Sequence, residues 1–398
     1  MKRTVLSWAF YDFANTVFSA IVLTYYFPLY LTSLTQQNVS LGLATTSAML
    51  LAGLFVPWLG ALSDRTGKTK VYLVRTTLLC ILFVFGLSLF TGVPMLIFSF
   101  LLACFFYHSS LVFYSSLLPV IAEPREQGFA SGAGTGLGYL GILFALPVAH
   151  VVDGMFGRRF VFLVAGVLFL LFSLPLFFWV PERKVDRPTP FSWGTIGGEW
   201  KKVFKTLRSL PKNPPFLWFF LGNFFVVDTI NTMIFWLVVY MTRVFDPSRD
   251  HLMMIYLAFN FTAFLFGFAA GKLTDRWNAH KVLLGAAVSL FLTVILLGLT
   301  GSLWAFVVLA LTGGSFGFAA VWTAARKRVV ELSPSNAIGE YFGLYNLTTK
   351  ISVAGSLVFS ILADRFGFRL ALLSLAFPSG VGFLFLWLSR KARAAYPP

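Results

Sequence analysis

The stretch that decides the fold is Gly60-Ala61-Leu62-Ser63-Asp64-Arg65-Thr66-Gly67-Lys68-Thr69-Lys70, a polar turn that follows an apolar run. A shorter version, Gly271-Lys272-Leu273-Thr274-Asp275-Arg276, recurs 211 residues later, again after an apolar run. Asp153 and Asp364 open similar turns and are also 211 residues apart. This spacing predicts a three-span unit repeated four times, with two units in each half. Internal repeats of this kind are typical of secondary transporters.

Composition agrees with a membrane protein. The 398 residues are 58% hydrophobic and only 12% charged, and the mean hydropathy is +0.81. Soluble domains carry about 25% charged residues. A membrane span needs about 20 apolar residues, so the chain has room for twelve spans and short loops, and for no large soluble catalytic domain.

The predicted fold is an all-α membrane protein with twelve transmembrane helices in two pseudo-symmetric six-helix bundles. The bundles are expected at 1–181 and 214–398, joined by a cytoplasmic linker at 182–213. The spans are expected near 5–32, 41–63, 71–91, 94–121, 131–152, 160–181, 214–242, 251–271, 282–300, 302–325, 340–363 and 369–389.

The linker predicts an amphipathic helix. Its apolar residues recur at helical spacing, with lysines and an arginine on the opposite face: Trp200, Val203, Phe204, Leu207 and Leu210 against Lys201, Lys202, Lys205 and Arg208. Such a helix suits the cytoplasmic membrane surface. An ordinary solvated linker helix fits the same pattern.

The net charge of +16 is placed in a way that favours a bilayer rather than nucleic acid. Only six of the 31 basic residues lie in the odd-numbered inter-span loops, and most of the others lie at the termini and in the even-numbered loops. The positive-inside rule then puts both termini in the cytoplasm. We therefore expect an integral membrane protein.

Two matched acid–amide pairs are the main candidates for binding. The first span carries Asp12-Phe-Ala-Asn15-Thr16, and the seventh carries Asp228-Thr-Ile-Asn231-Thr232. Residues three apart share one face of a helix, and charged side chains within spans are rare and mark function by default. The two pairs are expected to face one another and to bind an ammonium group, a cation or a coupling proton. Local capping or pairing of each aspartate is the alternative.

Other polar residues join the candidate site. Lys350 lies about 11 residues, or roughly 16 Å, into the eleventh span. It is expected either to act as a charge partner of Asp12 or Asp228 or to form a purely structural ion pair. The first and fourth spans also carry the polar side chains Tyr11, Tyr107 and His108. A histidine within a span can relay protons, or it can make a hydrogen bond that is only structural. A glycine run at Gly132, Gly134, Gly136, Gly138 and Gly141 predicts close helix packing.

The turn at Gly60–Lys70 resembles the G-x-x-x-D-R-x-G-[RK]-[RK] signature of the major facilitator superfamily. Gly271–Arg276 repeats it, with Asn278 in place of the second glycine. The resemblance implies that these loops form a conformational latch between the cytoplasmic ends of the halves, made by Gly60, Asp64, Arg65, Gly67, Gly271, Asp275 and Arg276. A carboxylate such as Asp64 is favoured at a helix amino terminus.

A narrower resemblance covers most of the chain. The segments Trp8–Thr16, Leu117-Leu-Pro119, Ser131–Gly141, Asp228–Thr232 and Glu340–Asn346 are similar to those of the autophagy-related vacuolar amino-acid effluxer family and its bacterial relatives. This resemblance implies transport of a small-molecule substrate, most simply an amino acid, by alternating access about a site lined by spans 1, 4, 7 and 10. It also implies a monomer and, because the chain is compact and lacks the long extra loops of the fungal members, a protein of a prokaryotic inner membrane. Protons are a candidate coupling ion.

Two other classes of function were weighed. An intramembrane enzyme needs a metal pair such as H-E-x-x-H or a serine in G-x-S-x-G, and the sequence has neither, so no enzyme, metal or cofactor is expected. An exporter of a lipid or a hydrophobic drug-like molecule is the alternative carrier. The 47 phenylalanines suit a greasy cavity, although lipid-facing surfaces also use phenylalanine.

Overall fold

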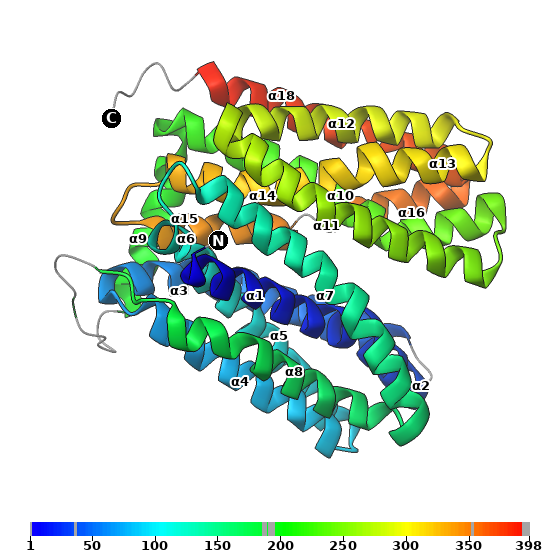
Figure 1. The fold of residues 1–398 in the computed structure, drawn as a ribbon, viewed down its shortest axis with the longest axis horizontal. Coiled ribbons are helices and arrows are strands. Elements are labelled where there is room, and N and C mark those ends of the chain that lie inside the picture. Colours follow the sequence, from blue (N-terminus) through cyan, green and yellow to red (C-terminus); the bar gives the residue numbers. More distant parts are fainter. Residues whose placement is uncertain (1, 36–37, 185–188, 190–195, 352–353, 392–398) are drawn as a thin grey trace. The chain divides into compact units, whose positions relative to one another are not determined.

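The structure is a computed structural model that describes residues 2–35, 38–184, 189, 196–351 and 354–391. Within these residues the chain is helical and contains no β-strand (Figure 1). The helices are apolar on most of their surface, which is typical of membrane spans and buried helices. A helix satisfies its own backbone hydrogen bonds, as a segment crossing lipid must.

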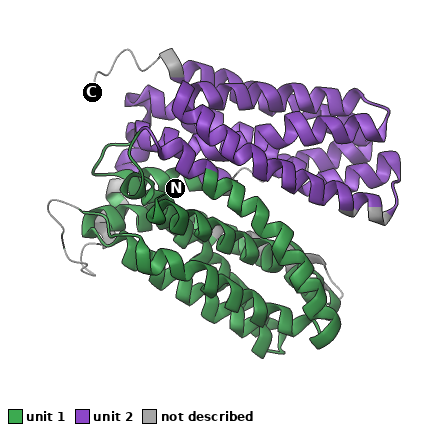
Figure 2. Ribbon diagram, viewed as in Figure 1, with its two compact units in different colours: residues 1–124, 133–203, 333–346 green, residues 125–132, 204–332, 347–398 purple. Residues whose placement is uncertain are grey.

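Contacts between residues divide the chain into two compact units (Figure 2). Unit 1 comprises residues 1–124, 133–203 and 333–346, and unit 2 comprises residues 125–132, 204–332 and 347–398. Three helices therefore begin in one unit and continue in the other. They are α7 (Gln127–Phe156), which begins in unit 2, and α9 (Ile196–Ser209) and α15 (Ile338–Ile351), which begin in unit 1.

Unit 1 contains the helices of the first half of the sequence. They are α1 (Arg3–Phe18), the π-helical segment η1 (Ser19–Tyr26), α2 (Phe27–Thr35), α3 (Asn38–Thr66), α4 (Thr69–Leu89), α5 (Val93–Ser116), the short α6 (Leu118–Ile121), most of α7, and α8 (Arg158–Trp179). The first predicted span is thus α1, η1 and α2 in succession. The wide π-helical turn begins three residues after Thr16.

Unit 2 contains the helices of the second half. They are α10 (Pro214–Phe245), α11 (Arg249–Trp277), α12 (Ala279–Leu299), α13 (Leu303–Leu309), the π-helical segment η4 (Ala310–Gly314), α14 (Ser315–Leu332), the last residues of α15, α16 (Ala354–Phe366), α17 (Phe368–Ser374) and α18 (Ala376–Lys391). The seventh predicted span is the single helix α10, without a π-helical segment.

Among the described residues, eleven helices are long and apolar enough to cross a membrane. They coincide with eleven of the twelve predicted spans. The remaining span, predicted at 340–363, corresponds to α15 and α16, which flank residues 352–353. Between the two sequence halves lie α9 (Ile196–Ser209) and a short 3-10 helix, η3 (Leu210–Lys212). The predicted linker helix is therefore present, although part of the linker, 185–188 and 190–195, lies outside the described residues.

Candidate functional site

Asp64 lies at the end of α3 and binds the amino terminus of α15, both within unit 1. Its Oδ1 accepts a hydrogen bond from the Gly339 backbone N–H and its Oδ2 accepts one from the Glu340 N–H, each at 2.8 Å. The first N–H groups of a helix have no partner within the helix. A carboxylate is also favoured there by the helix dipole. Asp64 therefore caps a helix that begins 274 residues further along the chain.

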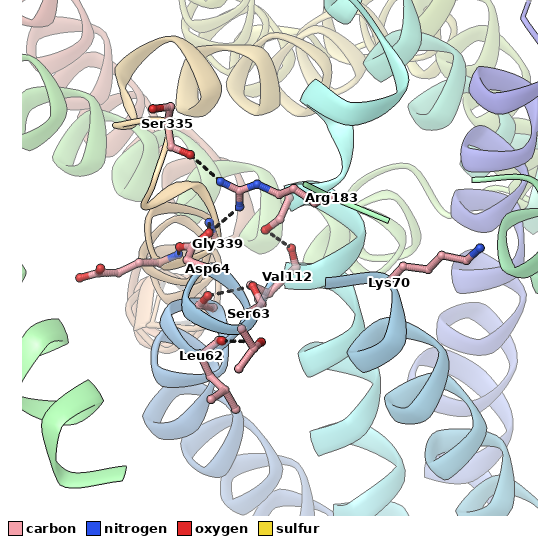
Figure 3. A network of polar contacts seen from close by, with 12 residues as sticks. Leu62, Ser63, Asp64, Lys70, Val112, Arg183, Ser335 and Gly339 are labelled. Atoms are coloured by element: carbon pink, nitrogen blue, oxygen red, sulfur yellow. Dashed lines mark hydrogen bonds and ion pairs between the residues drawn. The ribbon is translucent and has the colours of Figure 1, made fainter. Parts of the chain in front are cut away.

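Arg183 completes this site, which we call the Asp64 cluster (Asp64, Arg183, Gly60, Ser335, Gly339 and Glu340). Arg183 Nη1 lies 2.5 Å from Asp64 Oδ1, and Nη2 donates to the Ser335 carbonyl at 2.5 Å (Figure 3). The Asp64 side chain is fully buried and that of Arg183 is 9% exposed. A buried carboxylate with three charge-assisted or N–H donors is well compensated for its loss of water.

The residue before Arg183 performs a similar function for another helix. The Glu182 carboxylate accepts hydrogen bonds from the N–H groups of Lys70, at 2.7 Å, and Val71, at 3.1 Å. These groups belong to the first turn of α4. The segment after α8 therefore ties α4, α3 and α15 together through two consecutive charged side chains.

Two glycines allow α3 and α15 to approach each other. A Cβ atom added at Gly60 would collide with the Gly339 carbonyl oxygen, and a Cβ at Gly339 would lie 2.5 Å from the Gly60 carbonyl oxygen. No other residue fits at either position without backbone movement. The first glycine of the Gly60–Lys70 turn is thus required by the contact that Asp64 makes.

Asp275 repeats this arrangement in unit 2. Its carboxylate accepts hydrogen bonds from the N–H groups of Gly128, at 2.8 Å, and Phe129, at 2.6 Å. These are the second and third residues of α7. Lys327 of α14 supplies the positive charge, with Nζ 2.6 Å from Asp275 Oδ1. Together with Gly271, whose Cβ would lie 2.8 Å from the Gly128 carbonyl oxygen, these residues form the Asp275 cluster.

The backbone parts of the two clusters follow the sequence repeat. Gly128 and Gly339 are 211 residues apart, as are Gly60 and Gly271. The cations do not follow it, because Arg183 comes from the segment after α8 and Lys327 from α14. The other two aspartates of the repeat lack such an environment. Asp153 lies 3.9 Å from Arg158 at a partly exposed site, and Asp364 is exposed.

The turns that follow the two aspartates share an unusual backbone conformation. Gly67 has φ of 64°, and Asn278, which stands in the place of that glycine, has φ of 104°. The Asn278 side chain also accepts a hydrogen bond from the Lys281 N–H at 2.9 Å and caps α12. Of the two arginines of the signature, Arg65 is half-buried and Arg276 is exposed.

The first acid–amide pair is buried in unit 1. Asp12 is 6% exposed and Asn15 is 2% exposed. Among the described residues, neither the oxygen nor the nitrogen of the Asn15 amide has a hydrogen-bond partner. Asp12 packs against α7 at Gly134, where a Cβ would lie 2.8 Å from Asp12 Oδ2 and 2.9 Å from the Tyr114 hydroxyl. The glycines of α7 therefore do pack closely, as the sequence predicts.

The other predicted residues of unit 1 lie on α1 and α5. Tyr11 is fully buried and its hydroxyl is hydrogen-bonded to Thr77 Oγ1. Tyr107 and His108, on α5, are also buried, and their rings are 4.9 Å apart. Tyr107 stacks at an angle on Phe18 of α1, with ring centroids 4.6 Å apart. The structure thus brings α1 and α5 together around these groups.

The second acid–amide pair binds the eleventh span within unit 2. Asp228 is 6% exposed, and its Oδ1 accepts a hydrogen bond from the Gly355 N–H at 3.0 Å. Asn231 donates from Nδ2 to the Thr349 carbonyl at 3.4 Å. Lys350 belongs to α15, but its side chain lies outside the described residues.

Sequence reasoning missed several of these residues. Gly128 and Gly339 were detectable, because the 211-residue spacing of the aspartates applies to them as well. Arg183, Glu182 and Lys327 carry no such signal, since they look like ordinary members of the basic loops. Within the described residues, no group of three or more histidine, cysteine, aspartate or glutamate side chains is placed to hold a metal ion.

Comparison with known proteins agrees with this architecture. The chain is 24% identical over 396 residues to YxiO, an uncharacterised MFS-type transporter of Bacillus subtilis, covering 91% of this chain and 88% of that protein. It is 25% identical to a multi-drug resistance efflux pump PmrA homologue of Lactococcus lactis, covering 93% and 90%. Autophagy-related protein 22 of Yarrowia lipolytica is 25% identical over 308 residues, covering 67% of this chain and 51% of that protein.

Solved structures share the fold. The human organic anion transporter MFSD10 superposes with a TM-score of 0.79 at 15% identity, covering 96% of this chain and 99% of that one. FucP in its outward conformation gives 0.77 at 14% identity, covering 100% and 99%. The predicted all-α transporter fold is therefore confirmed. The model of the Major Facilitator Superfamily matches residues 9–351 and 220–398, and the chain is an integral membrane protein of that superfamily.

Proposed function

We propose that this chain is a secondary active transporter that moves a small solute, an amino acid, across the membrane by alternating access. The observation that carries the proposal is the buried Asn15 amide beside Asp12 on α1. An amide in a protein interior is nearly always hydrogen-bonded, and leaving it unpaired costs about 1–3 kcal/mol. A solute that pairs with this amide recovers that free energy.

The Asp64 and Asp275 clusters are proposed to act as conformational latches. In each cluster the aspartate accepts hydrogen bonds from two backbone N–H groups at the amino terminus of a helix and forms an ion pair with one cation. In alternating access, such contacts form in one state and separate in another. Each contact stabilises the state in which it is made, and its loss in the other state must be offset elsewhere.

An amino acid is supported by two features. The sequence of Autophagy-related protein 22 matches two thirds of this chain, and a site with a carboxylate and an amide suits a zwitterion. Export of a lipid or a hydrophobic drug-like molecule is the second candidate. It is favoured by the similarity to the Lactococcus lactis protein, which is named as a multi-drug efflux pump homologue.

A screen of thermal stability separates these substrate classes. A ligand that binds only the folded protein raises its melting temperature by mass action. We expect amino acids to raise the melting temperature of the purified protein and neutral lipids and amphipathic drugs to leave it unchanged. The opposite ranking would favour the second candidate.

Proton coupling is proposed from the buried carboxylates of Asp12 and Asp228. It is tested by uptake of labelled amino acid into proteoliposomes with and without a pH gradient. We expect the gradient to drive accumulation and Asp228→Asn to abolish that drive. Uptake that ignores both changes would remove proton coupling and leave facilitated transport in its place. A monomer in a prokaryotic inner membrane, with both termini cytoplasmic, completes the proposal.

A further inference from the structure

The two acid–amide pairs share the pattern D-x-x-N-T but have different surroundings. In unit 1 the amide is buried without a partner. In unit 2 both members of the pair bind the backbone of the neighbouring span. Equal sequence at matched positions therefore does not mean equal function.

In unit 1, two unpaired polar groups lie on facing helices. Within the part of the chain that the structure describes, neither atom of the Asn15 amide has a partner, and Thr135 Oγ1, on α7, is also buried and without a hydrogen bond. Thr135 directly follows Gly134, the residue that packs against Asp12 Oδ2. The amide presents an acceptor and two donors, and the hydroxyl presents one of each. A ligand with both donors and acceptors fits these groups.

Two aromatic side chains, Trp8 and Tyr114, lie near the carboxylate of this pair. Trp8 and Tyr114 are stacked with centroids 4.2 Å apart, and Tyr11 lies 5.2 Å from Tyr114. The Tyr114 hydroxyl and the Trp8 ring meet Asp12 Oδ2 at the same glycine, Gly134. Tryptophan and tyrosine beside a carboxylate are suited to a cation, because ring faces attract positive charge. The π-helical segment η1 also begins just after this pair, and such segments are frequent at functional sites.

In unit 2, both members of the pair are hydrogen-bonded to the backbone of the eleventh span. Asp228 accepts the Gly355 N–H, and a Cβ at Gly355 would collide with the Asp228 carboxylate. One turn before and two turns after Asp228 along α10, further side chains bind the same span: Asn223 to Thr348 at 2.9 Å and Trp236 to Ser356 at 2.9 Å. Asp228 is thus one of a row of polar contacts that fix α15 and α16 on α10.

We propose that the two pairs divide the work: Asp12 and Asn15 bind the ammonium group of the transported solute, and Asp228 positions α16. The inference rests on the proposed function and narrows it to solutes that carry an ammonium group. The solute's ammonium group donates to Asp12 and to Asn15 Oδ1. Asn15 Nδ2 and the Thr135 hydroxyl donate to its acceptor end. Asp228 then does not contact the solute: it positions α16 and, in the proposed coupling, carries a proton.

The test uses three probes of nearly the same size: L-leucine, L-leucinamide, which keeps the ammonium group, and 4-methylpentanoate, which lacks it. Binding to the full chain in detergent is measured by thermal stabilisation. We expect leucine and leucinamide to bind and 4-methylpentanoate not to bind. Asp12→Asn should weaken leucine binding about 10–100-fold, the loss of one charged hydrogen bond. Asp228→Asn should change it less than about threefold, and the control Asp153→Asn not at all.

A second measurement does not depend on a ligand. Asp228→Ala should speed amide hydrogen exchange in the peptide that covers Ala354–Phe366, by about tenfold, because it removes the acceptor of Gly355. Asp12→Asn should leave that peptide unchanged. This readout also shows whether each variant is folded.

The outcomes are distinct. If wild type is stabilised by none of the natural amino acids, the amino-acid proposal fails and the present inference fails with it. If leucine binds but Asp12→Asn and Asp228→Asn weaken it equally, transport of an amino acid stands and the division of work is wrong. Tight binding of 4-methylpentanoate would overturn the ammonium assignment alone.

Discussion

The Asp64 and Asp275 clusters share their backbone hydrogen bonds but differ in their cation and in their burial. Both carboxylates accept two backbone N–H groups at the start of a helix that is distant in sequence. The Asp64 side chain is fully buried and pairs with an arginine, whereas Asp275 is 15% exposed and pairs with a lysine. Backbone geometry is preserved between the halves and the source of the positive charge is not.

This difference shows that the sequence repeat preserves the backbone contacts of each aspartate and not its ion-pair partner. A backbone N–H is available in any sequence, so a helix terminus survives substitution of its side chains. The cation that neutralises each aspartate needs only to lie near the carboxylate, and a different segment supplies it in each half. Arginine also presents a rigid fork of donors, whereas lysine is a compact point charge. The greater burial of Asp64 and the two hydrogen bonds that Arg183 donates predict larger effects in the Asp64 cluster.

Removing the Asp64 carboxylate should have the largest effect. Asp64→Ala leaves Arg183 buried without its partner and two N–H groups of α15 without an acceptor. Loss of one member of a buried ion pair costs about 3–5 kcal/mol. The melting temperature of the purified protein in detergent measures it. Arg183→Ala in the same background should recover part of the loss, and no recovery would contradict the pairing.

Asp275→Ala should destabilise the protein less, by about 1.5–3 kcal/mol, the range for hydrogen bonds to a charged group. The Asp275 carboxylate is already partly exposed, so water replaces part of the contacts that are lost with it. The same melting experiment compares the two variants directly. A larger loss for Asp275→Ala than for Asp64→Ala would reverse the proposed ranking.

Substitution of the glycine at each helix terminus should also destabilise the Asp64 cluster more than the Asp275 cluster. A Cβ at Gly339 meets the backbone carbonyl of Gly60, at 2.5 Å, whereas a Cβ at Gly128 meets side-chain atoms of Asp275 and Thr274. Side chains move more readily than backbone, so we expect Gly339→Ala to cost about 2–3 kcal/mol and Gly128→Ala about 1 kcal/mol. Gly285→Ala, with no atom within 4 Å, is the matched control and should not destabilise.

Restoring the glycine of the second turn should have the smallest effect, and a favourable one. Asn278 has φ of 104° and ψ of 155°, a region that is essentially restricted to glycine and costs other residues about 1–3 kcal/mol. Asn278→Gly relieves this strain and loses only a few tenths of a kcal/mol of helix capping. A small rise in melting temperature is expected. Asn278→Ala, which keeps the strain and loses the cap, should lower it.

The sequence predicted the fold more completely than the site. Long apolar runs and the 211-residue repeat are local or periodic signals, and they located the spans, the acid–amide pairs and the turns at Asp64 and Asp275. The partners of these aspartates depend on packing between distant segments: Asp64 and Gly339 are 275 residues apart in the chain. Arg183 follows the end of α8 like any basic loop residue, and only the folded structure brings it to Asp64. The engagement of Asp228 by Gly355 is likewise visible only in the structure.

The most direct test of the account is counterflow of a labelled amino acid in proteoliposomes by wild type, Asp64→Ala and Asp275→Ala. We predict that wild type exchanges the solute and that each variant exchanges it at least about tenfold more slowly, while the solute still raises the melting temperature of both variants. That result places the two carboxylates in the transport cycle rather than in the binding site. Exchange at the wild-type rate by either folded variant would contradict it.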